Sequence, residues 1–398
     1  MSIRAIEQMN YLRSILYFVF WCLCNTLAAQ EEVPVNPPWI EARGYIKDLQ
    51  SVSFADSINS LSSVNLFHNR LNFKFNIAKN LTGRVEFRNR IFYGDQVKQI
   101  PAFGDIINQY NGWLNLSKLW VNERALVVHS VIDRVLLQYS GDRWDIRVGR
   151  QRINWGINNI WNPNDIFNAY NFLDFDYEER PGNDAIRIQH FFKNNSTLEA
   201  AFRPGKQAGE HTAAVLYKFN KKRYDFQFLA GLDQADLVVG AGWAGNIKNA
   251  GFKGEMSYFL PVGNTADSTA NFAMSLMVDQ TLANNWYLSA AALFNSQPSG
   301  TATGSGSIFS SQLSAKNLFP YRYSFYAGVV KSVSPITSVS LSVIFSPEKS
   351  SLILFPSFAW SIAKNFDLDI TAQSFFAREG GGYRALGNAV YLRSKWSF

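Results

Sequence analysis

Cysteine is almost absent from the chain: the only two, Cys22 and Cys24, lie near the N-terminus. The residues around them have the pattern of a secretion signal. Arg4 and Arg13 precede the apolar core ILYFVFWCLC, and the small residues of NTLAAQ follow it. We therefore expect residues 1–29 to be cleaved on export. The remaining chain then has no cysteine, which excludes a disulfide framework, a thiol nucleophile and a thiolate metal site.

Long hydrophobic runs are also missing. Beyond the N-terminus no segment approaches the roughly 20 continuous apolar residues that a membrane-spanning helix needs, which excludes a helical membrane bundle. Charged residues make up only 17% of the chain, and the formal net charge is +7, or +6 after loss of Arg4, Glu7 and Arg13. This balance is mildly basic, and because it contains no Lys/Arg block it predicts no nucleic-acid partner.

From about Glu41 onward, apolar and polar residues alternate with the period of two that is typical of β-strands. The pattern is clear in RLNFKFNIA (70–78), GRVEFRNRIF (83–92) and FDLDITAQSF (366–375). In a β-sandwich the apolar face would be the buried core. In an outer-membrane barrel the apolar face meets lipid and the polar face lines the lumen.

The connections between these segments favour the barrel. Short turns alternate with long connections along nearly the whole chain, as they do in barrels with short periplasmic turns and long extracellular loops, whereas a sandwich has no reason to keep this alternation. We predict an all-β fold, a transmembrane antiparallel β-barrel of about 18 strands over residues 30–398. The predicted long connections are 94–127, 154–183, 203–211, 262–270, 297–320 and 378–388.

The chain ends on AVYLRSKWSF, a strand-like segment with no polar tail. A closed barrel leaves no edge only if its last strand pairs with its first. We expect this segment to be the closing strand, with Trp396 and Phe398 facing lipid. It is similar to the C-terminal aromatic signal that outer-membrane barrels present to the barrel-assembly machinery.

The connection at about 154–183 is long enough to indicate a function or an inward fold. Aromatic residues give it anchors with which to pack, so we expect it to enter the barrel as a constriction; a cap on the outside is the alternative. The aromatic residues are Trp155, Trp161, Phe167, Tyr170, Phe172, Phe175 and Tyr177. The predicted constriction residues are Trp155, Trp161, Asp165, Asp174, Asp176, Glu178, Glu179 and Arg180.

Three motifs in this region, GRQRINWG, NPNDIF and ERPGNDAIRI, resemble the porin-like outer-membrane barrels that include the alginate-export proteins. The resemblance covers about 145–190 and implies a monomeric barrel that passes an acidic polysaccharide or small anions through a charged, loop-restricted lumen. No substrate-binding arginine ring can be matched. The matching positions are Gly149, Arg150, Gln151, Trp155, Gly156, Asn162, Pro163 and Asp165.

The polar face of the first strands is rich in arginine. Guanidinium groups in a narrow pore attract anions and bind carboxylate or phosphate in a bidentate way. The alternative is a salt-bridge network that stiffens the barrel, and acidic residues on the same face also leave a transverse field open. The predicted pore-lining residues are Arg70, Lys74, Arg84, Glu86, Arg88, Arg90, Arg134, Asp145, Arg147 and Arg187.

Besides transport, two other classes of function are an enzyme and a structural or surface-binding barrel. The four histidines, His68, His129, His190 and His211, show no nucleophile-elbow or zincin spacing, so we expect no catalysis, metal or cofactor. The sequence therefore predicts a porin in the outer membrane of a Gram-negative bacterium that passes small hydrophilic, anionic solutes or an acidic polysaccharide. The alternatives are a closed structural or surface carbohydrate-binding barrel and an outer-membrane hydrolase.

Overall fold

The structure is a computed structural model that describes residues 38–55, 57, 59–109, 112–169, 172–174, 176, 178–207, 209–262, 269–300, 313–379 and 381–398. The predicted signal peptide and the aromatic residues Tyr170, Phe175 and Tyr177 lie outside this set. The unit Ile40–Phe398 contains all the strands considered below.

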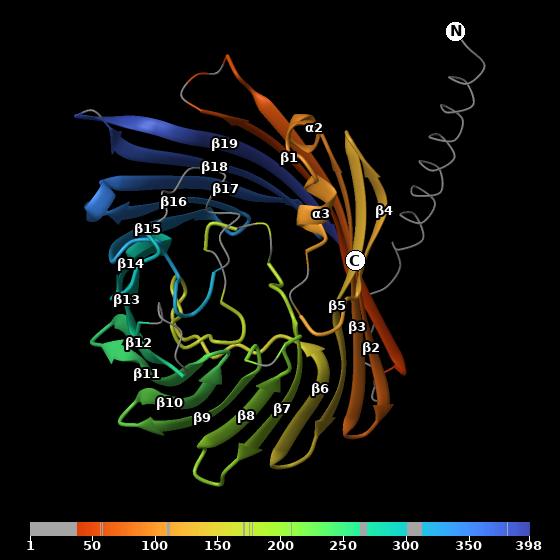
Figure 1. The fold of residues 1–398 in the computed structure, drawn as a ribbon, viewed down its shortest axis with the longest axis vertical. Coiled ribbons are helices and arrows are strands. Elements are labelled where there is room, and N and C mark those ends of the chain that lie inside the picture. The colour runs from red at the N-terminus through yellow and green to blue at the C-terminus, as the bar shows by residue number, and fades with distance from the viewer. Residues whose placement is uncertain are drawn as a thin grey trace. The chain divides into compact units, whose positions relative to one another are not determined.

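Eighteen of the nineteen strands in this unit form a closed antiparallel barrel, which confirms the predicted fold (Figure 1). Each strand of the wall pairs with its neighbours in sequence, except that β5 follows β3, because β4 pairs with the first half of β5. The strands are β1 (Ile40–Phe54), β2 (Ser62–Ala78), β3 (Leu81–Tyr93), β4 (Ser117–Glu123), β5 (Leu126–Ser140), β6 (Trp144–Gln151), β7 (Asn183–Phe191), β8 (Thr197–Arg203), β9 (Thr212–Lys221), β10 (Tyr224–Asp233), β11 (Asp236–Ile247), β12 (Ala250–Pro261), β13 (Asn271–Leu282), β14 (Trp286–Asn295), β15 (Tyr323–Ser334), β16 (Thr337–Ser346), β17 (Ser351–Ala363), β18 (Phe366–Glu379) and β19 (Gly382–Ser397).

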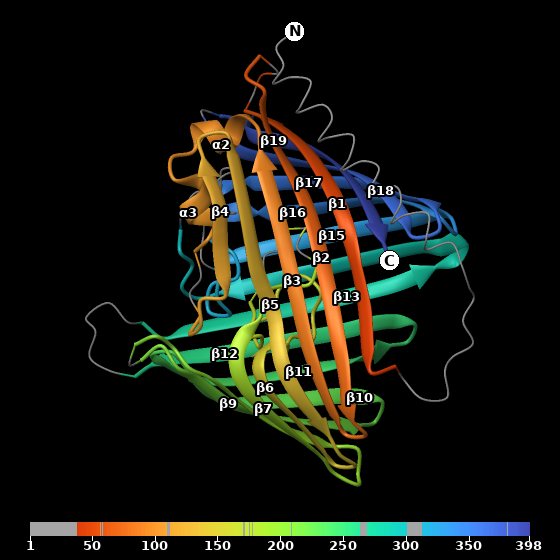
Figure 2. The ribbon, with the colours of Figure 1, turned by 90° about the vertical axis from the view of Figure 1, so that its right-hand side faces the viewer.

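Closure comes from pairing of β1 with β19, in a register that runs from Tyr45 opposite Ser397 to Phe54 opposite Asn388. Beyond the last paired residue, the backbone N–H groups of Gly44 and Phe398 each donate to the carbonyl oxygen of the other, at 2.9 Å. In Figure 2 the strands of the near wall are inclined against those behind them, as tilted strands of a closed barrel are.

One predicted connection was wrong. The segment 378–388 was expected to be a long connection, but most of it is strand. Arg378 pairs with Tyr383 and Glu379 with Gly382, so β18 and β19 continue almost to the glycines. A bulge at Phe375 and Phe376 shifts the register and interrupts the period of two on which the sequence argument depended.

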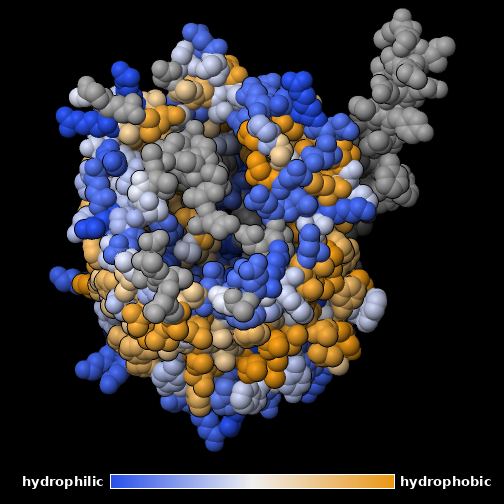
Figure 3. Space-filling view, viewed as in Figure 1, coloured by the Kyte–Doolittle hydropathy of each residue, from blue (hydrophilic) through white to orange (hydrophobic). Residues whose placement is uncertain are grey.

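The outer face of the wall is apolar. On β9, Ala214 and Leu216 are buried inside, whereas Val215 and Tyr217 are 45% and 37% exposed on the outside. The same alternation leaves Phe228 exposed on β10, and Figure 3 shows such residues as a hydrophobic surface over the lower part of the barrel. A band of this kind is what the hydrocarbon core of a bilayer requires of a barrel.

The inner face differs between two parts of the wall. On β1 and β2 the inward side chains include Lys47, His68 and Arg70, all of which are buried. From β7 to β14 the buried inward positions include a continuous cluster of small and apolar residues such as Ala201 and Ala273, with polar residues such as Glu199 between them. We call the first part of the lumen wall the charged half and the second part the apolar half.

Short helices accompany the connections. Helices α2 (Asp95–Gln99) and α3 (Phe103–Ile107) lie between β3 and β4, where a long loop was expected, and Val97 of α2 packs with Phe92 and Val127. The 3-10 helices η1 (Ala283–Asn285) and η2 (Pro347–Lys349) fill two turns. Among the described residues, no helix has the length and hydrophobicity needed to cross a membrane.

The closing pair generates a prediction about folding. A methyl group at Gly44 would lie 2.3 Å from the carbonyl oxygen of Arg70 and 2.9 Å from the ring of Phe398, so Gly44→Ala should lower the free energy of unfolding by about 1–3 kcal/mol. A Cβ at Gly382, which pairs with β18 at the other end of β19, meets nothing within 4 Å, so Gly382→Ala is the control. The measurement is the unfolding transition of detergent-refolded barrels, and equal transitions for the two variants would contradict the closure geometry.

Candidate functional site

The connection between β6 and β7, residues 152–182, enters the barrel and crosses its lumen (Figure 1). Its first part packs against the apolar half of the wall. The indole Nε1 of Trp155 donates to Glu199 Oε1 on β8 at 2.7 Å, and Gln227 Nε2 on β10 donates to the carbonyl oxygen of Trp155 at 2.7 Å. Trp155 also meets Phe167 edge-on, with ring centroids 4.9 Å apart. The loop therefore has a core that it shares with the wall.

The middle of the loop packs more deeply on the far wall. Trp161 and Leu173 are buried in one cluster with residues of β13 to β18 and of the segment before β15, including Met277 and Phe319. Gln373 Nε2 on β18 donates to the carbonyl oxygen of Leu173 at 2.7 Å. These contacts carry the chain across the barrel to the side where β18 and β19 begin the charged half.

The loop then returns along the charged half through four carboxylates, which we call the acidic segment: Asp174, Asp176, Glu178 and Glu179. Lys47 Nζ on β1 lies 2.7 Å from Asp176, and Glu178 is paired with Lys395 at 2.7 Å and with Arg393 at 3.1 Å, both on β19. Glu179 lies 3.7 Å from Arg70 Nε on β2. The basic residues of β1, β2 and β19 thus hold the acidic segment against the wall by charge.

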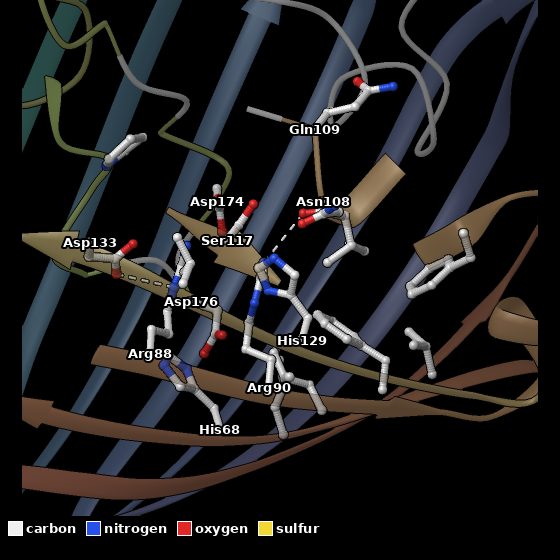
Figure 4. A pocket seen from close by; sticks show the side chains of 18 of the residues that line it. His68, Arg88, Arg90, Asn108, Gln109, Ser117, His129, Asp133, Asp174 and Asp176 are labelled. Carbon is white, nitrogen blue, oxygen red and sulfur yellow. Dashed lines mark hydrogen bonds and ion pairs between the residues drawn. The ribbon is translucent and has the colours of Figure 1, made fainter. Parts of the chain in front are cut away.

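A cavity of about 770 Å³ lies on one side of the acidic segment. Figure 4 shows Asp174 and Asp176 in the same cavity as His68, Arg88 and Arg90. Its apolar part comes from the interface between the wall and helices α2 and α3. That part includes Leu66, Phe92, Ile100, Phe103 and Ile107.

The charged groups of this cavity are joined in a network. Arg88 Nε lies 3.1 Å from Asp133 Oδ2, the same oxygen that is 2.6 Å from Arg70 Nη1. Arg90 Nη2 is 3.0 Å from His129 Nδ1. Asp133 lies at a bulge where β5 shifts register against β3, so that it faces the lumen beside Arg134 instead of alternating with it.

A second cavity of about 350 Å³ lies beside the turn between β15 and β16. It is lined by Glu178, Arg393 and Lys395 together with serine, threonine and aspartate side chains of β15 to β18. The acidic segment therefore contributes to both cavities, Asp174 and Asp176 to the larger and Glu178 to the smaller.

The residues predicted to line the pore are largely paired with carboxylates or carbonyls. Arg147 lies 2.8 Å from Asp145, Arg187 lies 2.6 Å from Glu199, and Lys74 lies 2.8 Å from Glu41. Arg70 also reaches Glu86 at 2.6 Å. Arg134 donates to the carbonyl oxygens of Glu179 and Arg180, at 2.9 and 2.7 Å. Arg84 is exposed. For the paired residues these contacts favour the salt-bridge network over an unbroken guanidinium wall.

Several residues of the site were not identified from the sequence. Lys47, Asp133, Arg393 and Lys395 were not among the predicted lining residues. Arg393 and Lys395 had a usable signal, because they alternate with the aromatic residues of the final strand. Asp133 had none, since a bulge cannot be located from alternation alone.

Arg150, one of the residues matched to the alginate-export barrels, forms a buried pair with Asp184. Arg150 Nε is 2.8 Å from Asp184 Oδ1, and Arg150 also donates to the carbonyl oxygens of Leu114 and Ile132. The backbone N–H of Leu114 donates to Asp184 Oδ2 at 2.9 Å. The pair therefore fixes the chain that leads into β4 beside the start of the inward loop.

Two acids of the inward loop have shifted pKa values of opposite sign. Burial raises the pKa of Asp165 to about 6, although the amide of Trp155 opposes the shift. Burial also favours the neutral form of Glu178, but the hydrogen bond and charge of Lys395 and the charge of Arg393 outweigh it and hold the pKa below the ordinary 4.5. Ionised Asp165 thus costs stability at neutral pH, whereas ionised Glu178 contributes stability that is lost as the pH falls through its lowered pKa.

Two of the four histidines line the larger cavity, His68 and His129. His190 instead meets Trp144 with ring centroids 4.3 Å apart. Within the described ranges, no group of three His, Cys, Asp or Glu side chains has the geometry to hold a metal ion.

The lowered pKa of Glu178 predicts a pH dependence. Conductance through the barrel should rise as the pH falls through the lowered pKa of Glu178, because protonated Glu178 no longer pairs with Arg393 and Lys395. Single-channel recording as a function of pH is the measurement. Glu178→Gln should show the raised conductance at every pH, and an unchanged acid-induced step in that variant would assign the titration to another group.

Comparison with known proteins rests on structure, because neither a family model nor a curated protein sequence matches the chain. The fold is similar to OccK11 (OpdR) of Pseudomonas aeruginosa, with a TM-score of 0.57 and 11% identity over 90% of this chain and 96% of that one. OccAB2 of Acinetobacter baumannii matches with a TM-score of 0.57 and 8% identity, over 90% of this chain and 98% of its own. OpdK of P. aeruginosa, in a structure with vanillate, matches with a TM-score of 0.55 and 9% identity over 90% and 98%. The chain therefore has the fold of the porin barrels of the bacterial outer membrane.

Proposed function

We propose that the chain is an outer-membrane channel that passes small hydrophilic solutes, and that the favoured solutes are anionic. The likeness of the fold to the Pseudomonas and Acinetobacter barrels supports a channel in the bacterial outer membrane. In this proposal residues 1–29 are removed on export, and the barrel-assembly machinery receives the final strand through Trp396 and Phe398. Outer-membrane lipid then surrounds the apolar outer face.

One observation carries the proposal: the acidic segment contributes side chains to two charged cavities. A barrel built only as a scaffold has no need for two charged cavities that share one loop. The segment is held by ion pairs with Lys47, Arg393 and Lys395, which an ionic solute can replace one at a time. Passage is then physical selection by charge and width, with no covalent step.

The charges define how an anion would move. Arg88 and Arg90 line the larger cavity together with Asp133, Asp174 and Asp176, so an anion that enters can take the place of a carboxylate beside an arginine. The anion then competes with Asp176 and Glu178 for Lys47 and Arg393. Each of these cations exchanges one carboxylate for another, so neither is left unpaired in a site of low dielectric.

The size of the larger cavity distinguishes between the two solute classes that the sequence left open. A volume of about 770 Å³ is in the range that encloses a single small molecule. It supports small solutes over an acidic polysaccharide, which would need an unobstructed path for a whole chain.

The reversal potential of the purified protein in a planar bilayer under a salt gradient tests this function. We expect a steady conductance that prefers chloride to potassium. The double variant Arg88→Gln/Arg90→Gln should lower that preference by roughly threefold, since it removes two positive charges from the larger cavity. Arg124→Gln, in the exposed turn between β4 and β5, is the control and should leave the reversal potential unchanged.

Two outcomes would contradict the proposal. A folded barrel with no conductance would indicate a closed lumen and favour the structural or surface-binding alternative. A conductance that prefers cations in the unaltered protein would reject anionic solutes while leaving the channel itself in place.

A further inference from the structure

The wall opposite the acidic segment is shaped to receive the inward loop. Two glycines of β11, Gly240 and Gly242, lie directly beneath it. A Cβ at Gly240 would be 2.8 Å from Asn164 Oδ1, and one at Gly242 would be 2.8 Å from Ile157 Cδ1. Only residues without a side chain leave the room that the loop occupies at these positions.

Beside these glycines, β12 presents a carboxylate to the loop backbone. Glu255 is fully buried. Its Oε1 accepts hydrogen bonds from the backbone N–H groups of Ile157 and Asn158, the latter at 2.6 Å, and its Oε2 accepts one from Asn164 at 3.1 Å. Three amides from two separate turns of the loop therefore converge on one side chain.

The neighbouring contacts show that this is a built anchoring site. Asn158 Nδ2 donates to Ser275 Oγ on β13 at 2.9 Å, and Ser257 Oγ on β12 donates to Asn164 Oδ1 at 2.8 Å. Together with the three bonds to Glu255, these two bonds hold both stretches of the loop to β12 and β13.

The anchor is connected to the passage through the loop itself. From Asn164 the chain runs through the buried residues Ile166 and Phe167 to the buried Leu173, and the acidic segment begins at the next residue. Buried residues such as Ile166, Phe167 and Leu173 transmit a displacement because close packing leaves little free volume in which to absorb it.

We propose that Glu255 is a positioning residue that fixes the inward loop on the apolar wall and thereby sets the width of the passage on the opposite side of the lumen. The effect on width rests on the proposed channel function, whereas the anchoring does not. Glu255 acts through the loop and touches no solute.

The first test is hydrogen exchange of the loop amides, which needs no transport. In Glu255→Gln the side chain keeps its shape but places an NH2 group where one of the two oxygens accepted. One carbonyl oxygen cannot accept from both stretches of the loop, so either the amides of Ile157 and Asn158 or the amide of Asn164 should exchange about tenfold faster. Asp279→Asn is the matched control, because Asp279 is a wall carboxylate on β13 that pairs with Lys253 and Tyr287.

The second test is conductance. Glu255→Gln should give a single-channel conductance roughly double that of the unaltered protein and with larger fluctuations, while Asp279→Asn should not change it. Restraining the loop by another bond should reverse the effect. The restraint is a disulfide between Asn158→Cys and Ser275→Cys, introduced into Glu255→Gln, at two side chains that are already in contact. The native Cys22 and Cys24 lie in the predicted signal peptide and would not compete for it. Oxidation should restore the original conductance, and reduction should release it again.

The outcomes separate the two claims. Unchanged amide exchange in Glu255→Gln would overturn the anchor itself. Faster exchange with unchanged conductance would overturn its control of the passage, as would a disulfide that fails to restore the conductance. If the unaltered protein passes no ions, the proposed channel function fails, and the exchange experiment still decides whether Glu255 anchors the loop.

Discussion

Charge pairing between the inward loop and the barrel wall is the interaction on which the rest of the site depends. The acidic segment lies against Lys47, Arg70, Arg393 and Lys395, which come from three strands at the seam where the barrel closes. Closure of the sheet is what brings β1, β2 and β19 side by side. The same pairing therefore joins the ends of the barrel unit to a loop from its middle.

The inward loop also accounts for the division of the lumen into two halves. An inward loop of about 30 residues needs an apolar surface to bury its aromatic anchors, because only that burial offsets the loss of chain entropy. The small and apolar inner positions of β7 to β14 provide this surface. In the proposed channel, the charged half is the space through which a polar solute passes. Each half depends on the other, because the loop that fills one also supplies the carboxylates of the other.

The fold was largely predictable from the sequence, and the site only in part. Alternation at segments such as 70–78, together with the regular order of short and long connections, predicted the antiparallel barrel and its strand number. Alternation also distinguishes the two faces of a strand, so Arg70 and Arg88 could be proposed as lumen residues. It could not supply their partners. Asp133 faces the lumen only because of a bulge, and the contacts of Glu178 with Lys395 join residues more than 200 positions apart.

The anchoring of the loop was even less accessible. Glu255 shares the inward face of β12 with Ser257 and Phe259, and from the sequence it is one acidic residue among many. Its role depends on the backbone N–H groups of Ile157, Asn158 and Asn164. Every residue except proline has a backbone N–H group, so the sequence does not show which of them a carboxylate will bind. The glycines of β11 had a detectable pattern, but only the position of the loop shows what they make room for.

An exchange of the charges of Glu178 and Lys395 tests most directly the central claim that ion pairs hold the acidic segment against the wall. Glu178→Lys should raise the single-channel conductance, because it places a positive charge beside Arg393 and Lys395 and repels the acidic segment from the wall. Adding Lys395→Glu should bring the conductance back toward that of the unaltered protein, since it restores one pair with its charges reversed. If the two changes add independently, or if neither alters the conductance of a folded barrel, the acidic segment is not held by charge and does not form the constriction.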